Sequence, residues 1–185
     1  MLGQEHADGL GPVKVGFPDC CFSVGKNWFR YRAGALIIED GYFLAMKTAS
    51  APHFYTVGGG VHLGELSEDC VRREVQEETG VPYEVDRLAA VCENLFIGKE
   101  SQLLGFDCHV IEFYYLMKSR GSRNLHSESY GWNHERESLH WIPLAELPDT
   151  LIKPDFLRTR LPEILAETAL VHIVNDERPG SGPSV

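Results

Sequence analysis

The 185-residue chain has no apolar run long enough to cross a membrane. A bilayer-spanning helix needs about 20 mostly apolar residues, and polar side chains interrupt every apolar stretch before that length. The first twelve residues contain Glu5 and Asp8 and lack both a basic start and an apolar core, so they do not have the pattern of a signal peptide. We therefore expect a cytoplasmic protein with no membrane partner.

Cysteine is present in a number and spacing that suit neither disulfides nor zinc. The five cysteines are an odd number, and no two are spaced as Cys-x-x-Cys. Cys20 and Cys21 are adjacent, which is a poor geometry for bridging each other. The pattern argues against a disulfide framework and a four-ligand zinc site.

Positive charge is also scarce. The chain has 17 Lys and Arg against 27 Asp and Glu, for a formal net charge of −10. An acidic surface repels polyphosphate backbones, so long nucleic acids and anionic membranes are poor candidate partners. A small anionic substrate remains compatible with this charge if something cationic lies at its site.

What the chain does have is the composition of one folded domain. Hydrophobic residues make up 43% and charged residues 24%, close to the average for globular proteins, and the length allows a sizeable core. There is no internal repeat and no interdomain linker. We expect a domain over residues 13–174, with flexible ends at 1–12 and 175–185.

Apolar patterning predicts a domain that mixes strands and helices. Trp28–Glu39 and Tyr42–Met46 flank Asp40-Gly41, a dipeptide typical of a β-hairpin turn. The further predicted elements are strands over Val85–Ile97, Cys108–Met117, Leu139–Pro143 and Leu170–Val174, and a helix over Asp155–Glu167, which Pro162 could kink. Because no regular strand–helix–strand rhythm is present, the fold class is α+β.

A glycine-rich segment followed by an acidic helix stands apart from the rest. Gly58-Gly59-Gly60 leads into a helix predicted over Ser67–Thr79, which Ser67 can cap and Gly80 can end. The segment is not a phosphate-binding P-loop, because Glu65 stands where that motif needs lysine. It is not a dinucleotide fingerprint either, because Leu63 replaces the third glycine.

The helix gathers three carboxylates on one side. At about 100° per residue, Glu74, Glu77 and Glu78 fall within an arc of about 100°. A cluster of hard oxygen ligands on a rigid element suits Mg²⁺ or Mn²⁺. The alternative is a solvated acidic face, which the glycine-rich loop, Glu65 and Arg73 at fixed offsets disfavour.

This segment resembles the Nudix box, G-x5-E-x7-R-E-U-x-E-E-x-G-U with U apolar, at every defined position. The matching residues are Gly59, Glu65, Arg73, Glu74, Val75, Glu77, Glu78, Gly80 and Val81. Outside the defined box, Val57 and His62 stand where the family often has proline and an acidic residue. The resemblance implies a Nudix fold, a mixed β-sheet sandwiched between α-helices.

The resemblance also implies an activity and a cofactor. Family members hydrolyse a nucleoside diphosphate linked to another group, using Mg²⁺ or Mn²⁺ and water attack on phosphorus. By resemblance, Glu74, Glu77 and Glu78 are metal ligands, Glu65 lies at or near the metal, and Arg73 orients the glutamates. Glu77, Glu78 and Arg73 are thus expected catalytic residues. Two other functions stay open: a nucleotide sensor without turnover, and an isomerase or DNA-repair relative. The complete carboxylate set disfavours the first, and the acidic balance disfavours a repair role.

The general base is not fixed by the box. The polar segment Lys118–Ser138 is predicted to be a long loop, and such loops are often functional. We rank its Glu135 first, because it lies just before the strand near Leu139. We expect Glu137 to be held on the wrong face of that strand. Glu128, Glu112 and a box glutamate are the alternatives.

Substrate contacts are expected at the entry to the glycine-rich segment. Phe54 and Tyr55 could stack on a base, with plain strand packing as the alternative, and Gly58–Gly60 would lie against the phosphates. Trp132 in the long loop is a second candidate for stacking. The predicted partner is a small nucleotide-type molecule, and a homodimer is compatible with the sequence.

Overall fold

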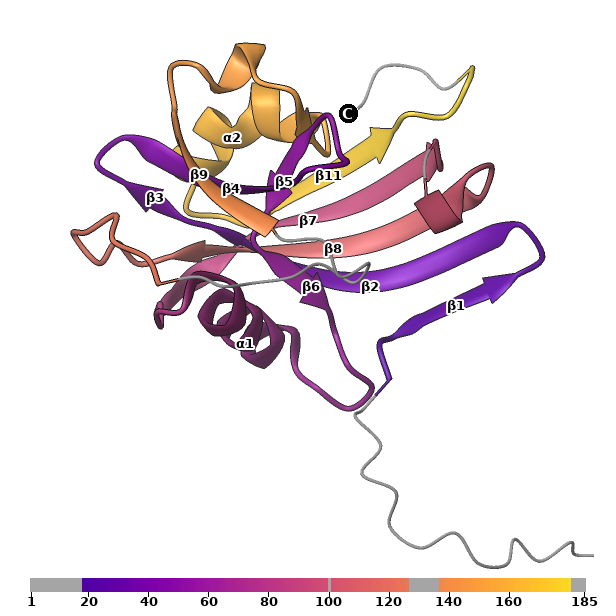
Figure 1. Cartoon of the computed structure of the whole chain (residues 1–185), viewed down its shortest axis with the longest axis horizontal. Coiled ribbons are helices and arrows are strands. Elements are labelled where there is room, and N and C mark those ends of the chain that lie inside the picture. The colour runs from indigo at the N-terminus through magenta and orange to yellow at the C-terminus, as the bar shows by residue number, and fades with distance from the viewer. Residues whose placement is uncertain (1–17, 100, 127–136, 181–185) are drawn as a thin grey trace, which may run out of the picture.

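The computed structural model describes residues 18–99, 101–126 and 137–180. Two β-sheets, each with parallel and antiparallel pairs, form the layers of the fold. Helix α1 (Ser67–Thr79) lies on one side and α2 (Phe156–Ala166) on the other (Figure 1). This is the α+β arrangement that the sequence predicts. In the part of the chain that the structure describes, no helix has the length and apolar character to span a membrane.

The larger sheet has strand order β1-β2-β8-β7-β11, and β6 also pairs with β2. Strands β2 and β8 are parallel, as are β7 and β11, whereas β7 and β8 are antiparallel. The strands are β1 (Cys21–Val24), β2 (Asn27–Leu36), β6 (Gly58–Gly60), β7 (Val85–Ile97), β8 (Asp107–Met117) and β11 (Val171–Asp176). Segments far apart in sequence therefore meet across this sheet. Strand β11 ends two residues beyond the expected domain end at 174.

The smaller sheet has strand order β10-β5-β4-β3, and β9 also pairs with β4. Its strands are β3 (Ile38–Glu39), β4 (Tyr42–Thr48), β5 (Phe54–Thr56), β9 (Glu137–Pro143) and β10 (Ile152–Lys153). The predicted hairpin turn is confirmed, because Asp40 and Gly41 have φ values of 51° and 80°, as a type I′ turn requires. Two short 3₁₀ helices, η1 (Ser101–Leu103) and η2 (Leu147–Asp149), complete the elements.

The predicted single strand Trp28–Glu39 is divided between the two sheets. Leu36 still pairs with β8, whereas Ile38 pairs with β4. Leu36 packs in the core cluster that includes α2, and Ile37 packs in the cluster that includes α1; both are fully buried. The chain passes from one sheet to the other at this point without a loop.

Helix α1 has the predicted bounds but not the predicted cap. The N-cap is Leu66, with no side-chain cap bond. The hydroxyl of Ser67 instead lies 2.7 Å from that of Tyr115 on β8. The other end is as predicted: Gly80 adopts the left-handed conformation, with φ of 72°. The helix buries Cys70, Val71, Val75 and Thr79.

Two core clusters lie on opposite faces of the larger sheet. Alternation along β8 sends Tyr114 into the cluster with α2 and Tyr115 into the cluster with α1. Helix α2 starts one residue later and ends one earlier than predicted, and Pro162 lies inside it. Its buried residues are Phe156, Leu157, Leu161 and Ile164. The two packed layers hold α1 and β6 in fixed positions.

Candidate active site

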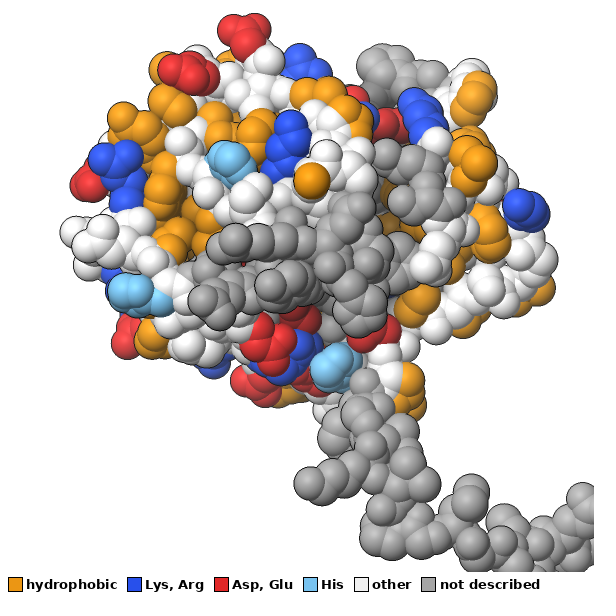
Figure 2. Space-filling view, in the orientation of Figure 1, with side chains coloured by type: hydrophobic (Ala, Val, Ile, Leu, Met, Phe, Trp, Pro, Cys, Tyr) orange, Lys and Arg blue, Asp and Glu red, His pale blue; other side chains and the backbone are white. Residues whose placement is uncertain are grey.

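A cavity of about 880 Å³ lies between the larger sheet and the β5 and β10 side of the smaller one. This volume is typical of small-molecule sites. Strand β6 and two residues of α1, Glu74 and Glu78, line one end of the cavity. In the space-filling view, acidic side chains gather with basic ones over α1, next to a histidine (Figure 2).

The packing of α1 decides which glutamates face inward. Val71 and Val75 are fully buried against the larger sheet, and this fixes the rotation of the helix. Glu74 lies at the edge of that buried face, with a side chain that is 15% exposed, whereas the side chain of Glu77 is 60% exposed. The predicted arc therefore spans the boundary between cavity and surface.

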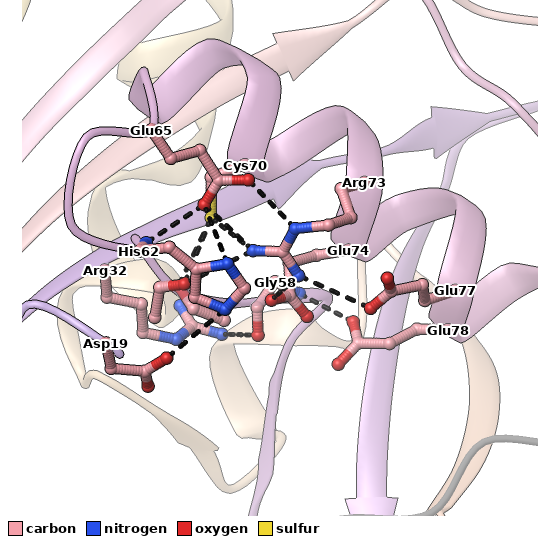
Figure 3. A network of polar contacts seen from close by, with 12 residues as sticks. Asp19, Arg32, Gly58, His62, Glu65, Cys70, Arg73, Glu74, Glu77 and Glu78 are labelled. Atoms are coloured by element: carbon pink, nitrogen blue, oxygen red, sulfur yellow. Dashed lines mark hydrogen bonds and ion pairs between the residues drawn. The ribbon is translucent and has the colours of Figure 1, made fainter. Parts of the chain in front are cut away.

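Arg73 links three of the box glutamates (Figure 3). Its Nε and Nη2 donate to the two carboxylate oxygens of Glu65 at 2.9 and 3.0 Å, and Nη1 donates to Glu74 Oε1 at 2.6 Å. A longer contact of 3.4 Å joins Nη1 to Glu77 Oε2. The hydrogen bonds from Arg73 hold the pKa of Glu65 at about 2. This geometry is what an orienting role for Arg73 requires.

Glu78 is the most deeply buried of the box carboxylates. Its Oε2 accepts a hydrogen bond of 2.7 Å from the Gly58 amide. Burial raises the pKa of Glu78 well above its ordinary value, and the nearby Glu74 carboxylate raises it further. Burial also raises the pKa of Glu74, despite the bond from Arg73. Arg73 bonds Glu74 directly and Arg32 lowers the pKa of both carboxyl groups, but these cations do not offset the effect of burial.

These side chains fit a divalent cation by chemistry. Among the described residues, no three Asp, Glu, His or Cys side chains already converge as a metal site. The oxygens of Glu74 and Glu78 are hard donors, and a divalent cation would neutralise the charge that raises their pKa values. Glu77 is exposed and has only the long contact with Arg73 among the bonds described above, so its carboxylate can reorient.

The three glycines form β6 and allow close approach of the helix. They pair with β2, Gly60 opposite Arg32 and Gly58 opposite Gly34. A Cβ at Gly59 would collide with the carboxylate of Glu74. Gly58 has φ of 132°, which side chains rarely adopt. Glycine is therefore needed here both for backbone conformation and for space.

Arg32 on β2 is a site residue that the sequence did not single out. Its Nη1 donates to Thr56 Oγ1 at 3.0 Å, and Nη2 donates to the carbonyls of Thr56 and Gly58 at 2.8 and 3.0 Å. Burial opposes its charge, but the negative charges of Glu112, Glu78 and Glu74, with Tyr114, together outweigh this, so the pKa of Arg32 is raised. Arg32 thus holds the backbone segment whose Gly58 amide donates the hydrogen bond to Glu78. The sequence signal that could have indicated Arg32 is the pair of arginines, Arg30 and Arg32, at alternate positions of a strand rich in aromatic residues.

Asp19 is a second residue that the sequence analysis missed. Its Oδ2 lies 3.3 Å from Arg30 Nη2 and its Oδ1 lies 3.5 Å from His62 Nε2 (Figure 3). The amide of His62 donates to Glu65 at 3.0 Å. Nothing in the local sequence marks Asp19, because an isolated bridge to His62 brings it to the site.

The two aromatic residues expected to stack on a base lie on opposite sides of β5. Tyr55 lines the cavity, and its hydroxyl donates to Glu137 Oε1 at 2.8 Å. Phe54 packs against the core and meets His140 edge-on, with ring centroids 5.2 Å apart. Tyr55 therefore faces the cavity, whereas Phe54 packs against the core, which was the alternative interpretation of its role.

The position of Glu137 corrects an expectation. It was expected on the wrong face of its strand, but it lines the cavity and binds Tyr55. Glu112 also lines the cavity, is 5% exposed, and accepts a hydrogen bond from the Tyr114 hydroxyl. The candidates Glu135, Glu128 and Trp132 lie outside the described residues, so Glu135 stays a prediction.

Comparison with known proteins relates both the sequence and the fold to one family. The family model of the NUDIX domain matches residues 28–166. A MutT-like protein from Streptomyces ambofaciens is 44% identical over 62 residues, a match that spans 34% of this chain and 40% of that relative.

Two solved structures share the fold at low identity. The MutT protein from Methanosarcina mazei Go1 is 20% identical, with a TM-score of 0.57, and the match covers 77% of this chain and 96% of that one. An ADP-ribose pyrophosphatase from Streptococcus suis is 14% identical, with a TM-score of 0.53, covering 77% and 98%. At such identities these structures establish the architecture.

Proposed function

This chain is a member of the Nudix hydrolase family, and from that premise we propose that it hydrolyses the pyrophosphate bond of a nucleoside diphosphate linked to another group, with Mg²⁺ or Mn²⁺ as cofactor. The observation that carries the proposal is the buried pair of Glu74 and Glu78 at the closed end of a cavity of nucleotide size. Burying two neighbouring carboxylates is costly unless cations accompany them, and of this pair only Glu74 accepts a bond from Arg73.

The metal ligands in this proposal are Glu74, Glu77 and Glu78, with Glu65 acting through Arg73. When bound, the cation supplies neutralisation of the pyrophosphate and a lower pKa for water. The chain contributes positioning. Arg73 restrains Glu65 and Glu74, and the Gly58 amide restrains Glu78.

The substrate in this proposal lies along the cavity, with its phosphates against β6 and Tyr55 beside them. The backbone of Gly58–Gly60 can approach the phosphates closely because no side chain intervenes. A small nucleotide-type molecule suits the cavity volume, whereas the net charge of −10 opposes binding of a long nucleic acid.

The candidates for the general base are Glu135 and Glu137, with Glu112 and a box glutamate as alternatives. A base must come within hydrogen-bond reach of the attacking water, directly or through one water. Glu137 lines the cavity close enough to Glu78 to raise its pKa. Glu135, two residues earlier, remains our first candidate from the sequence, and Glu137 now stands beside it.

The first experiment measures phosphate-bond hydrolysis across nucleoside diphosphate derivatives, with and without Mg²⁺. We expect metal-dependent turnover and a loss of at least about 100-fold in kcat for Glu78→Gln, a nearly isosteric change that removes a charged ligand. Near-normal kcat for Glu78→Gln at saturating Mg²⁺ would contradict the ligand assignment.

Glu68→Gln is the matched control for this experiment. Glu68 lies on the same helix but faces solvent, where it pairs with Arg72 at 2.6 Å. The same chemical change there should leave kcat within about twofold, because an exposed pair contributes little. Tight nucleotide binding without turnover of any derivative would favour the sensor alternative.

A further inference from the structure

The cavity continues from the box glutamates across the larger sheet, where apolar side chains line it together with Lys99, Lys153 and Glu177. Trp28, Phe96 and Val110 line this far half, together with Asn94. Val110 pairs with Arg30 on one side and with Asn94 on the other, and Asn94 pairs in turn with Asn175. One row of residues thus crosses four strands under the cavity.

The row that contains Asn94 lies at a distance from the proposed phosphate end that a bound nucleotide can span. Arg32 is in the next cavity-facing row and two strands away from Asn94. With strands about 4.8 Å apart and about 6.7 Å between alternate residues, the two backbone positions are about 12 Å apart. Gly60 of β6 lies opposite Arg32 and one strand further away, about 16 Å from Asn94 between backbones. A nucleoside diphosphate and the reach of the Asn94 side chain can bridge such a distance, which places Asn94 where a base would lie if the phosphates meet β6.

The orientation of the Asn94 amide is fixed by its neighbours. Asn175, which is 1% exposed, donates from Nδ2 to Asn94 Oδ1 at 2.9 Å and to Glu177 Oε1 at 3.1 Å. An ionised carboxylate only accepts hydrogen bonds, so Glu177 determines which end of Asn175 carries the NH₂ group. Asn175 must then face the oxygen of Asn94.

The NH₂ group of Asn94 consequently points away from Asn175. Among the described residues, no hydrogen-bond acceptor contacts it. Asn94 is 7% exposed and lines the cavity, and its NH₂ group is not among the buried polar atoms that lack partners. The group is therefore a donor that is open to the cavity.

We propose that Asn94 donates a hydrogen bond to a carbonyl oxygen on the base of the substrate, so that the enzyme selects keto bases over amino bases. The proposal rests on the proposed function, because it places a nucleotide in the cavity. A keto oxygen satisfies the Asn94 donor, whereas an amino group at the same position would present donor to donor and leave both unpaired. Trp28, Phe96 and Val110 supply apolar surface for the ring.

The test compares ligands that differ in this group and in the ring nitrogen beside it, which carries a hydrogen only in the keto bases. Binding of uridine diphosphate and cytidine diphosphate is measured by calorimetry with Mg²⁺, and inosine and adenosine diphosphates form a second pair. We expect the wild-type protein to bind each keto member about tenfold more tightly or better, because a polar group left unpaired in an apolar site costs about that factor.

Asn94→Asp should reverse the preference. An aspartate can still accept from Asn175, but its other oxygen offers the cavity an acceptor, which suits an amino group. Any added repulsion of the phosphates affects both members of a pair and cancels in their ratio. Asn94→Leu should bind the two members equally, and Asn124→Asp, the same change at an exposed asparagine, should leave the ratio unchanged.

Equal wild-type affinities, or a preference that both Asn94 variants retain, would overturn the proposal. Thermal melting shows whether each variant is folded, and the wild-type pairs decide the question even if a variant is not. Hydrolysis of the matching uridine and cytidine diphosphate sugars separates the two proposals. Preferential binding without hydrolysis contradicts only the proposed activity, and hydrolysis without preference contradicts only the role of Asn94.

Discussion

At the scale of the residue, Arg32 connects the sheet to the end of the cavity that Glu78 lines. One guanidinium holds the side chain of Thr56 and the carbonyls of Thr56 and Gly58. Only a planar group with several fixed donors can make these three bonds at once. Its effect passes through the Gly58 amide to Glu78, so Arg32 positions a ligand that it does not touch.

Replacing Arg32 by lysine should therefore damage catalysis more than the retained charge suggests. We expect kcat to fall by about 10- to 100-fold, because the Gly58 amide is no longer held against Glu78 and small displacements at a reacting centre are costly. The apparent Mg²⁺ affinity should fall as well. Steady-state kinetics over a Mg²⁺ series measures both quantities.

Thr56→Val is the control for Arg32→Lys. It removes one acceptor of the guanidinium and leaves both carbonyl bonds, so its kcat should remain within a few-fold of wild type. A lower melting temperature with normal kcat and Mg²⁺ affinity in Arg32→Lys would show that Arg32 only stabilises the fold.

Glu135 and Glu137 give a second prediction at this scale. We expect Glu135→Gln to lower kcat far more than it weakens Mg²⁺ binding, since a base acts on water and not on the metal. Kinetics of Glu137→Gln decides between the candidates. A large loss there with a silent Glu135→Gln moves the base to Glu137, and silence from both returns the role to a box glutamate or to Glu112.

At the scale of the element, Glu39 at the end of β3 fastens the segment that follows β8. Its carboxylate accepts hydrogen bonds from the Ser119 hydroxyl at 2.6 Å and from the amides of Arg120 and Gly121 at 2.6 and 3.0 Å. Burial alone would raise the pKa of Glu39, but these bonds outweigh it and lower the pKa. The charged form of Glu39 therefore stabilises the fold.

This anchor predicts a loss of stability in acid. A carboxyl group whose pKa is lowered by folding contributes stability above its unfolded pKa, about 4.3, and loses it as the pH falls through the folded value. Glu39→Gln should lower the free energy of unfolding by about 1–3 kcal/mol at pH 7. Urea unfolding should show the difference from wild type shrinking below about pH 4.

Glu84→Gln serves as the control for the acid experiment. Glu84 pairs with Lys118 at 3.0 Å, but its side chain is 80% exposed, so the pair should contribute less than about 1 kcal/mol at either pH. An equal loss in the two variants at pH 7 would contradict the anchoring role of Glu39.

At the scale of the whole molecule, local patterns predicted more than long-range pairings did. The bounds of α1, the hairpin at Asp40-Gly41 and the bounds of β7 follow from periodicity and turn chemistry within a few residues of each other. The family motif lies within one glycine-rich segment and one helix, so its resemblance also identified the fold.

The missed site residues depend on contacts that no local pattern encodes. Arg32 and Asn94 enter the cavity because β2 and β7 both flank β8. Glu137 was placed wrongly because Leu139 and Trp141, on the same face of β9, pack against the core. At the start of β9, where Glu137 lies, the same face borders the cavity and no longer the core.

Metal binding should stabilise the molecule as a whole. A cation that binds only the folded state raises stability by mass action, and here it would also relieve the two buried carboxylates. Added Mn²⁺ should raise the melting temperature of the wild-type protein, and chelator should reverse the rise. The shift should be absent in Glu78→Gln and retained in Glu68→Gln; equal shifts in both would place the bound ion elsewhere.

The strand order of the larger sheet brings separate stretches of sequence to one cavity. The box glutamates and β6 lie within residues 58–78, whereas Asn94 is on β7 and its partner Asn175 is on β11. Under the two proposals, hydrolysis and base selection would thus depend on separate parts of the gene. Under both, substitutions on β7 and β11 would change the preferred base while the residues that carry hydrolysis are inherited intact.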